Sequence, residues 1–209
     1  DAKSGALLPD AHLYDLDLEA DYWSVHQYWL MCRDPLLFPG KQALPHDMTI
    51  EEVDPTADFA KQMYWEVGGP WIWGDRRAYS QQQWLDYTAL PGFRQFKLCL
   101  KDGTLAGYAE TSFDPDSGQA ELEYFGLLPH AVGMKAGPAF LSQIIGKLWD
   151  ANCSRIRIST CTLDHPGAFR VYSRCGFVRL SSHAISVPNA LKARIISPQE
   201  IQIRTKLLR

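Results

Sequence analysis

The sequence predicts an α+β fold with a mixed, mostly antiparallel sheet flanked by helices. Strand-like and helix-like patterns alternate along the chain, and the three strand patterns in its middle are joined by tight turns. Tight turns connect antiparallel strands, whereas a strand–helix–strand segment needs a crossover, so both kinds of pairing must occur in the sheet. A length of 209 residues suits one sizeable domain and is short for two.

The N-terminal part of the chain carries the weakest signals. We expect a single domain over residues 1–209, in which residues 1–45 form an N-terminal extension and residues 46–209 form the core. In the extension, apolar and polar residues alternate at 13–18, as in a short edge strand, and aromatic side chains form a weak helical stripe at 22–31. A proline-rich loop follows.

The core is predicted to start with one strand and two helices. The strand occupies residues 49–53, and Asp54 or Asp58 can cap the helix that follows, until two glycines and a proline at 68–70 stop it. Ser80 is the candidate N-cap of the second helix, which ends at about residue 89.

A three-stranded meander and further alternating elements complete the predicted fold. Turn-forming residues at 101–103 and 114–118 separate the meander strands, and a loop at 129–135 leads from the last of them into a long helix. The predicted strands of this part lie near 93–100, 105–113, 120–128, 155–160, 177–185 and 201–207, and its helices near 136–151 and 164–174.

Charge and apolar patterning exclude several partners. The chain carries 21 Lys and Arg against 24 Asp and Glu, a net charge of −3, which leaves no broad positive field for nucleic acid or an anionic membrane. No apolar run approaches the roughly 18–20 residues that span a bilayer, and the first residues lack the apolar segment of a signal peptide. We therefore expect neither a nucleic-acid nor a membrane partner.

The five cysteines are scattered and form no Cys-x-x-Cys pair, which favours neither a disulfide framework nor a zinc site. We expect a cytoplasmic protein that binds no metal. The first residue is Asp rather than Met, which suggests a processed or trimmed chain, or a domain excised from a larger polypeptide.

One strand–loop–helix segment, residues 121–141, is suited to bind an anion. Its loop and first helical turn contain Gly133 and Gly137, which allow a close approach to the backbone. Unpaired amides at the start of a helix, together with the positive end of its dipole, favour a phosphate or pyrophosphate there. The same connection is an ordinary tight turn in many folds, so this segment alone leaves both interpretations open.

These residues resemble the GNAT superfamily of acyl-CoA N-acyltransferases, whose pyrophosphate loop carries an (Arg/Gln)-x-x-Gly-x-(Gly/Ala) signature. The segment 165–177 is similar to a second pattern of this superfamily, Asn-x-x-Ala-x-x-x-Tyr-x-x-x-Gly-Phe, at matching spacing. Residues 67–77, 123–129 and 160–166 resemble a bacterial-type subgroup, so the resemblance extends over about residues 49–180.

The chain departs from the superfamily patterns at three positions. Val132 stands where Arg or Gln is usual, and Lys135 stands where the first signature glycine is usual. Lys135 offers a point charge in place of an arginine fork, while the backbone amides remain. His165 replaces the usual Asn that approaches the coenzyme A arm, and its imidazole adds a group that titrates near neutral pH.

The resemblance implies a base for the attacking amine, an acid for the departing thiolate and a donor to the oxyanion. Glu121 aligns with the general base, and Glu123 shares its strand face, so that their repulsion would raise one pKa. Tyr172 matches the tyrosine that protonates the thiolate. The backbone amide of Leu127 or Leu128 is the candidate oxyanion donor.

Further residues are implied in binding. Trp71 and Trp73 belong to an aromatic cluster expected to form the wall of an acceptor pocket. Each implied residue also has a purely structural interpretation, as an exposed strand glutamate or a core aromatic. The residues implied in binding acetyl-CoA or another acyl-CoA as co-substrate are Phe125, Leu127, Leu128, Val132, Gly133, Met134, Lys135, Ala136, Gly137, His165 and Ala168.

Three functions stay open on the sequence. The first is transfer of an acetyl group from acetyl-CoA to a small-molecule amine by direct attack in a ternary complex. The second is a polyketide loading domain that decarboxylates malonyl-CoA and passes acetyl to an acyl-carrier-protein thiol, with His165 as the catalytic acid for the enolate. The third is an inert module that only binds coenzyme A. A homodimer and a place in a larger polypeptide are both open.

Overall fold

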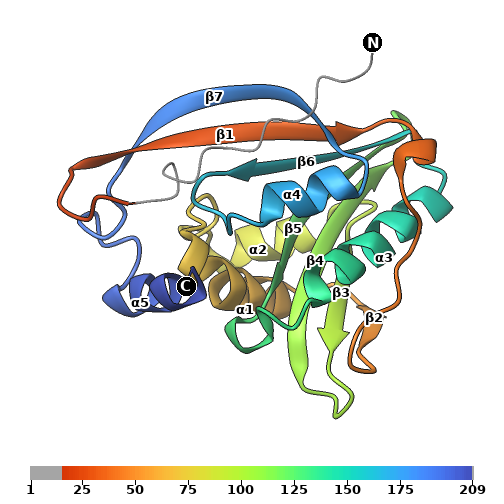
Figure 1. Cartoon of the computed structure of the whole chain (residues 1–209), viewed down its shortest axis with the longest axis horizontal. Coiled ribbons are helices and arrows are strands. Elements are labelled where there is room, and N and C mark those ends of the chain that lie inside the picture. Colours follow the sequence, from red (N-terminus) through yellow and green to blue (C-terminus); the bar gives the residue numbers. More distant parts are fainter. Residues whose placement is uncertain (1–15, 209) are drawn as a thin grey trace.

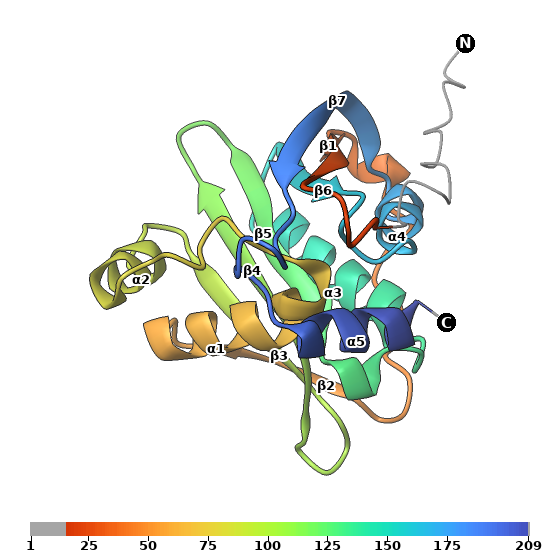
Figure 2. The same ribbon diagram turned by 90° about the vertical axis from the view of Figure 1, so that its left-hand side faces the viewer.

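The structure, a computed structural model, describes residues 16–208 and contains one sheet. Its seven strands are ordered β2-β3-β4-β5-β6-β1-β7, and every neighbouring pair is antiparallel except β5 and β6. The predicted α+β class with a mixed, mostly antiparallel sheet is therefore confirmed (Figures 1 and 2).

The elements follow one another with short connections in the core. The strands are β1 Tyr22–Cys32, β2 Thr49–Val53, β3 Arg94–Cys99, β4 Leu105–Asp114, β5 Gln119–Leu127, β6 Arg155–Cys161 and β7 Val178–Pro188. The α-helices are α1 Ala57–Gly68, α2 Gln81–Thr88, α3 Ala136–Asp150, α4 Ala168–Arg174 and α5 Pro198–Leu207.

The sheet divides into two halves where β5 and β6 separate. Their parallel pairing extends only from Gln119 to Leu122 on β5, although β5 continues to Leu127. Beyond that point β6 stays paired with β1, and β1 with β7, so these three strands turn away from β4 and β5 (Figure 1). An opening therefore forms between the two halves of one continuous sheet.

Helices cover both faces of the half of the sheet formed by β2, β3, β4 and β5. Phe140 and Ile144 of α3 pack in the main hydrophobic core with Phe96, Leu122 and residues of β6. On the opposite face, α1 packs against β4 and β5. Because β4 is covered on both sides, its middle is buried almost continuously rather than in alternation.

Most predicted elements are confirmed, and the sequence signals explain them. Ser80 caps α2 through a capping box with Gln83, as the sequence indicates. The helix α1 is capped by Thr56, not by Asp54 or Asp58, because the Thr56 hydroxyl accepts a hydrogen bond from the Phe59 amide. The helix α4 starts at Ala168, later than the predicted residue 164.

The helical stripe predicted at residues 22–31 is wrong, because this segment is strand β1. It lies between β6 and β7 and is paired with both, and Trp23 and Val25 are buried in the alternation of a strand. Pairing on both edges outweighs a weak local pattern, and aromatic residues favour strands. Since β1 belongs to the sheet, the core starts before the predicted boundary at residue 46.

The strand predicted at 201–207 is also wrong, since the segment belongs to helix α5. Ser197 and Glu200 form a capping box around Pro198 in the first turn, and the capping box is a helix-start signal. Of the edge strand predicted at 13–18, residues 13–15 lie outside the described residues, and residues 16–18 form no strand.

Candidate active site

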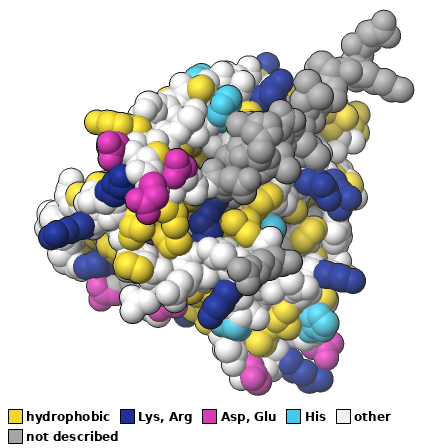
Figure 3. Space-filling model, turned by 60° about the vertical axis from the view of Figure 1, so that its left-hand side comes forward, with side chains coloured by type: hydrophobic (Ala, Val, Ile, Leu, Met, Phe, Trp, Pro, Cys, Tyr) yellow, Lys and Arg dark blue, Asp and Glu magenta, His cyan; other side chains and the backbone are white. Residues whose placement is uncertain are grey.

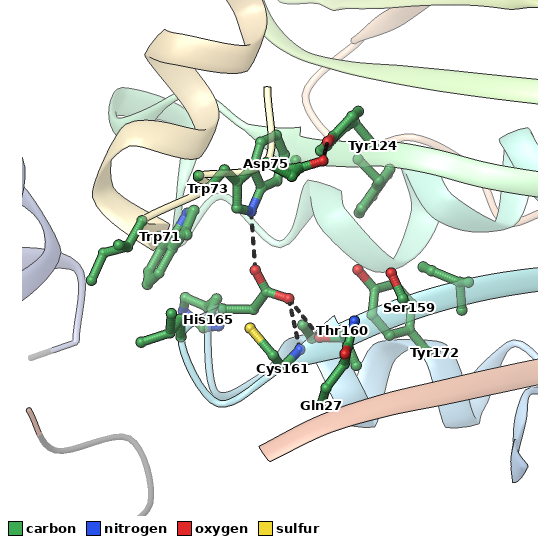
Figure 4. Close-up of a pocket in the computed structure, with 18 of the residues that line it drawn as sticks. Gln27, Trp71, Trp73, Asp75, Tyr124, Ser159, Thr160, Cys161, His165 and Tyr172 are labelled. Carbon is green, nitrogen blue, oxygen red and sulfur yellow. Dashed lines mark hydrogen bonds between the residues drawn. The ribbon is translucent and has the colours of Figure 1, made fainter. Parts of the chain in front are cut away.

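A cavity of about 1000 Å³ lies in the opening between the two halves of the sheet. It is lined by β5 on one side and by β6 and β1 on the other, with the start of α3, part of α4 and the loop after α1 completing the wall. Figure 4 shows Tyr124, Asp75, Trp71 and Trp73 on one side, facing residues of β6 across the cavity.

The start of α3 presents backbone amides to this cavity. Lys135, at the N-cap, has φ 60° and makes no side-chain capping bond, so the first turn of the helix is uncapped. A Cβ at Gly133 would meet nothing within 4 Å, and one at Gly137 only the Leu127 side chain at 3.9 Å. This is the open geometry that an anion needs at a helix N-terminus.

The residues predicted to contact coenzyme A divide into two groups. Those that line the cavity are Phe125, Leu127, Val132, Gly133, Lys135, Gly137, His165 and Ala168. Met134 and Ala136 do not line it, because Ala136 is buried in the main core and Met134 packs against that core. Their neighbours in the loop line the cavity, so at Met134 and Ala136 only the backbone is left to contact the coenzyme, and their predicted role stays a prediction.

Leu128 also does not line the cavity. Its side chain is buried among Met63, Val67 and Tyr108, and its amide donates to the Ala106 carbonyl at 2.9 Å. Because ladder amides alternate along an antiparallel strand, the amide of Leu127 points to the other side, toward the gap between β5 and β6. Of the two candidate oxyanion donors, only Leu127 has an amide oriented toward the gap.

The two glutamates of β5 both line the cavity, as their period-2 spacing predicts. Two nitrogens of Arg157 donate to Glu121 Oε2, at 2.6 and 3.1 Å, and among the described residues Glu121 Oε1 accepts no hydrogen bond. Burial raises the pKa of Glu121; the Arg157 hydrogen bond opposes this and the charge of Glu123 adds to it. Glu121 therefore keeps one open oxygen and a raised pKa.

Tyr172 lies on α4 and lines the cavity (Figure 4). Among the described residues its hydroxyl makes no hydrogen bond, and its ring packs against Phe177. Burial, with a smaller effect from Asp164, raises the pKa of Tyr172, so the phenol stays protonated at neutral pH. The hydroxyl is therefore available as a proton donor in the cavity.

His165 is held as a neutral imidazole. Its Nδ1 accepts a hydrogen bond from the Gly167 amide at 2.9 Å, and its ring packs edge-on to Trp71 at a centroid distance of 5.2 Å. Burial, followed by the positive charge of Arg204, lowers the pKa of His165. A proton remains on Nε2, where a neutral histidine is a hydrogen-bond donor and a weak acid.

Asp164 connects the two sides of the cavity. Its Oδ1 accepts from the Trp73 indole N–H at 3.0 Å, and its Oδ2 accepts from the Thr160 hydroxyl at 2.7 Å and the Cys161 amide at 3.1 Å (Figure 4). Sequence analysis assigned Asp164 only to a helix start. No periodic or spacing signal marks it, because its partner Trp73 is brought close by the fold.

Arg76 is a second side chain that sequence analysis did not place in the site. Its guanidinium lines the cavity, lies 3.6 Å from the Tyr87 ring centroid and is 3.5 Å from Glu123. The Tyr87 hydroxyl in turn donates to Glu110 at 2.9 Å. A polar network thus extends from the cavity into the interior.

Glu110, at the inner end of this network, provides a pH-dependent prediction. Burial raises its pKa to about 7, despite hydrogen bonds from Tyr87 and Gln95. The folded state then binds a proton that the unfolded state releases, so wild-type stability falls as the pH rises from about 4.5 to 7. We expect Glu110→Gln to match the wild type at pH 5 and to unfold with about 2 kcal/mol more free energy at pH 8.

Urea unfolding at both pH values measures this difference. Glu51→Gln, at an exposed position of β2, is the matched control and should show the same small difference from wild type at both pH values. A Glu110→Gln variant whose difference from wild type does not change with pH would contradict the raised pKa.

The described residues, 16–208, show three further properties. None of their helices is long and apolar enough to cross a membrane. No group of three or more His, Cys, Asp or Glu within residues 16–208 could hold a metal ion. All five cysteines are free thiols.

The sequence model of the Acetyltransferase (GNAT) family matches residues 58–177. The chain belongs to this family. The matched segment contains the uncapped start of α3, both glutamates of β5 and Tyr172, so it supplies part of the cavity wall, while β1, β7 and the C-terminal segment complete the wall from outside it. GNAT enzymes use an acyl-CoA as co-substrate, and the expectation of a GNAT acyltransferase domain is confirmed at the level of the family.

Solved structures share the GNAT fold at low identity. A GCN5-related N-acetyltransferase from Sphaerobacter thermophilus is 16% identical with a TM-score of 0.58, covering 80% of this chain and 53% of that one. One from Kribbella flavida is 16% identical with a TM-score of 0.53, covering 84% and 64%. A tandem GNAT protein from the clavulanic acid biosynthesis pathway is 16% identical with a TM-score of 0.52, covering 78% and 53%.

The chain thus spans a little over half to two thirds of the length of these structural neighbours, 53–64%. No curated protein sequence matches it. At this identity the neighbours establish the fold of the GNAT domain alone.

Proposed function

We propose that this GNAT protein is an acyl-CoA-dependent N-acyltransferase that transfers an acetyl group from acetyl-CoA to an amine by direct attack. The observation that carries the proposal is the uncapped, open start of α3 on the same cavity as Glu121 and Tyr172. An anion site and two candidate proton-transfer groups therefore share one space.

The residues present fit the diphosphate of coenzyme A. The first turn of α3 has no side chain capping it, and the space beside Gly133 and Gly137 is open. Lys135, exposed at the N-cap, adds a positive charge at the same position. Val132 contributes no charge, so the backbone amides and Lys135 replace the usual arginine or glutamine.

The reaction requires three tasks from the protein. Glu121 Oε1 takes a proton from the amine as its nitrogen bonds to the thioester carbonyl carbon. The Leu127 amide donates to the oxyanion of the tetrahedral intermediate. As the carbon–sulfur bond breaks, the Tyr172 hydroxyl gives a proton to the departing thiolate, and water restores that proton.

Replacing the base should lower activity and change its pH dependence. We expect Glu121→Gln to reduce kcat/KM by about tenfold or more, because the amide cannot accept the proton of the amine. In the wild type, activity should fall as the pH drops through the raised pKa of Glu121, since a base must be deprotonated. That acidic limb should be lost in the variant.

A steady-state pH profile of kcat/KM measures both effects. An exposed carboxylate serves as control, and Glu51→Gln should leave the profile unchanged. An identical acidic limb in Glu121→Gln would remove Glu121 from the role of base.

One assay separates the three functions considered for the chain. The protein is incubated with acetyl-CoA or malonyl-CoA and with amines or an acyl-carrier protein, and products are followed by mass. Amide formation from acetyl-CoA supports the proposal. Carbon dioxide release from malonyl-CoA with transfer to the carrier thiol would favour the loading domain, and coenzyme A binding without turnover would favour an inert module.

A further inference from the structure

The cavity has a second half that the coenzyme A residues do not occupy, and under the proposed function this half must admit the amine. It lies away from the start of α3, between β1 and β7 on one side and the loop after α1 on the other. The C-terminal segment bounds its far end through Ala190 and Ile195. The chemistry of these walls indicates which amine fits.

The far end of this half is hydrocarbon. Trp23, Ile72 and Leu163 line it and are buried together in one hydrophobic cluster, in which no more than 9% of any of these side chains is exposed. The Trp23 indole N–H donates to the Asp17 carbonyl at 2.9 Å, so it is not available to a ligand. A substrate hydroxyl or ammonium placed here would lose its hydrogen bonds to water without replacement.

Ile72 contributes to this wall at a conformational cost. Its backbone lies in the left-handed region, with φ 63° and ψ 34°, which a β-branched residue rarely adopts. Such strain persists only where the surrounding structure fixes it, at a cost on the order of 1–3 kcal/mol. Here the loop amides of Ile72 and Trp73 are bonded to the carbonyls of Gly69 and Gly68.

The near end, beside β5, is acidic. Asp75, Glu121 and Glu123 line it. Among the described residues, Arg76 lines it at 3.5 Å from Glu123 and 3.9 Å from Asp75. Arg157 pairs with Glu121 at 2.6 Å, so three carboxylates face two guanidinium groups. An ammonium group gains from these carboxylates, whereas a substrate carboxylate would meet like charge. On the face that Figure 3 brings forward, a group of acidic side chains lies beside the apolar ones, with basic side chains among them.

We propose that the acceptor is a primary arylalkylamine without a carboxylate. Its ammonium group lies beside Glu121 and Glu123, where the base is, and its aromatic ring packs against Trp23, Trp71 and Ile72. Polyamines and amino sugars are excluded by the hydrocarbon end, because their additional polar groups find no partner there.

A set of four amines tests this acceptor class. With saturating acetyl-CoA, kcat/KM for coenzyme A release should be about 100-fold higher for 2-phenylethylamine than for ethylamine, because the phenyl ring leaves water. L-Phenylalanine, which adds only a carboxylate, should be about tenfold or more below 2-phenylethylamine. Spermidine should be no better than ethylamine.

Two glycine variants identify the wall that holds the ring. Ile72→Gly removes a wall side chain while relieving the left-handed strain, so the protein should stay folded, and the ratio of kcat/KM for 2-phenylethylamine to kcat/KM for ethylamine should fall about fivefold. Asn152→Gly makes a similar change at an exposed left-handed position outside the cavity and should change neither value.

Calorimetric binding of the same amines to the protein saturated with coenzyme A separates the two proposals. If 2-phenylethylamine binds no tighter than ethylamine, or if L-phenylalanine or spermidine is preferred, the acceptor class is wrong whether or not turnover occurs. If 2-phenylethylamine binds as expected and no amine is acetylated, the acceptor site stands and the proposed N-acyltransferase function fails.

Discussion

Tyr172→Phe is expected to lower kcat for acetyl transfer about 100-fold while leaving the Kd for coenzyme A within about twofold. The hydroxyl is the only atom removed, and among the described residues it makes no hydrogen bond that holds the fold together. Its loss therefore removes the proton for the departing thiolate without opening a space in the core. Pre-steady-state measurement of amide formation, with calorimetry for coenzyme A, distinguishes kcat from binding.

The raised pKa of Tyr172 also predicts how kcat depends on pH. Because burial keeps the phenol protonated well above its ordinary range, the wild-type kcat should show no falling limb from this group up to about pH 10. Tyr79→Phe, at a half-buried tyrosine that does not line the cavity, is the matched control and should keep full activity. Equal turnover in Tyr172→Phe would remove the phenol from the mechanism.

The sequence predicted those helices and strands whose capping residues, turns or apolar periodicity lie within the segment itself. The meander, α2 and α3 were predicted correctly because tight turns and apolar periodicity depend only on residues close together in the sequence. β1 was misassigned because it is a strand through its pairing with β6 and β7, which lie more than 120 residues further along the chain. Such pairings leave little trace in local composition.

The wrong prediction for the segment of helix α5 has a different cause. The sequence Ser197-Pro198-Gln199-Glu200 is itself a helix-start signal, and it outweighs the short alternation of Ile201 and Ile203. The side chain of Arg204 on this helix is buried and donates to the Leu163 carbonyl. This hydrogen bond links α5 to the chain segment that follows β6, a contact that the predicted strand does not reveal.

The site was predictable where it depends on one strand–loop–helix segment. The spacing of Glu121 and Glu123, and the glycines at the start of α3, place these residues on the cavity as expected. Arg76 and Asp164 were missed because each acquires its role from a distant partner, Tyr87 or Trp73. Sequence does not tell which side chains of a loop face the core, and those of Leu128 and Met134 do so rather than line the cavity.

Gly137→Asp should raise the Kd for coenzyme A about 100-fold, because it places a negative charge beside the diphosphate. The same substitution should leave folding intact. A Cβ at this position meets only the Leu127 side chain at an ordinary 3.9 Å, and an acidic residue in the first turn interacts favourably with the helix dipole. We therefore expect the free energy of unfolding to stay the same or to rise by about 0.5 kcal/mol.

Two further variants separate charge from bulk at Gly137. Gly137→Asn has the size of Asp without its charge and should raise the Kd about fivefold, while Gly137→Ala should change it less than about threefold. Because the repulsion is electrostatic, added salt should narrow the difference between the Asp and Asn variants. Equal Kd values for Asp and Asn at low salt would mean that the start of α3 contacts an uncharged part of the coenzyme, and the diphosphate would have to be placed elsewhere in the cavity.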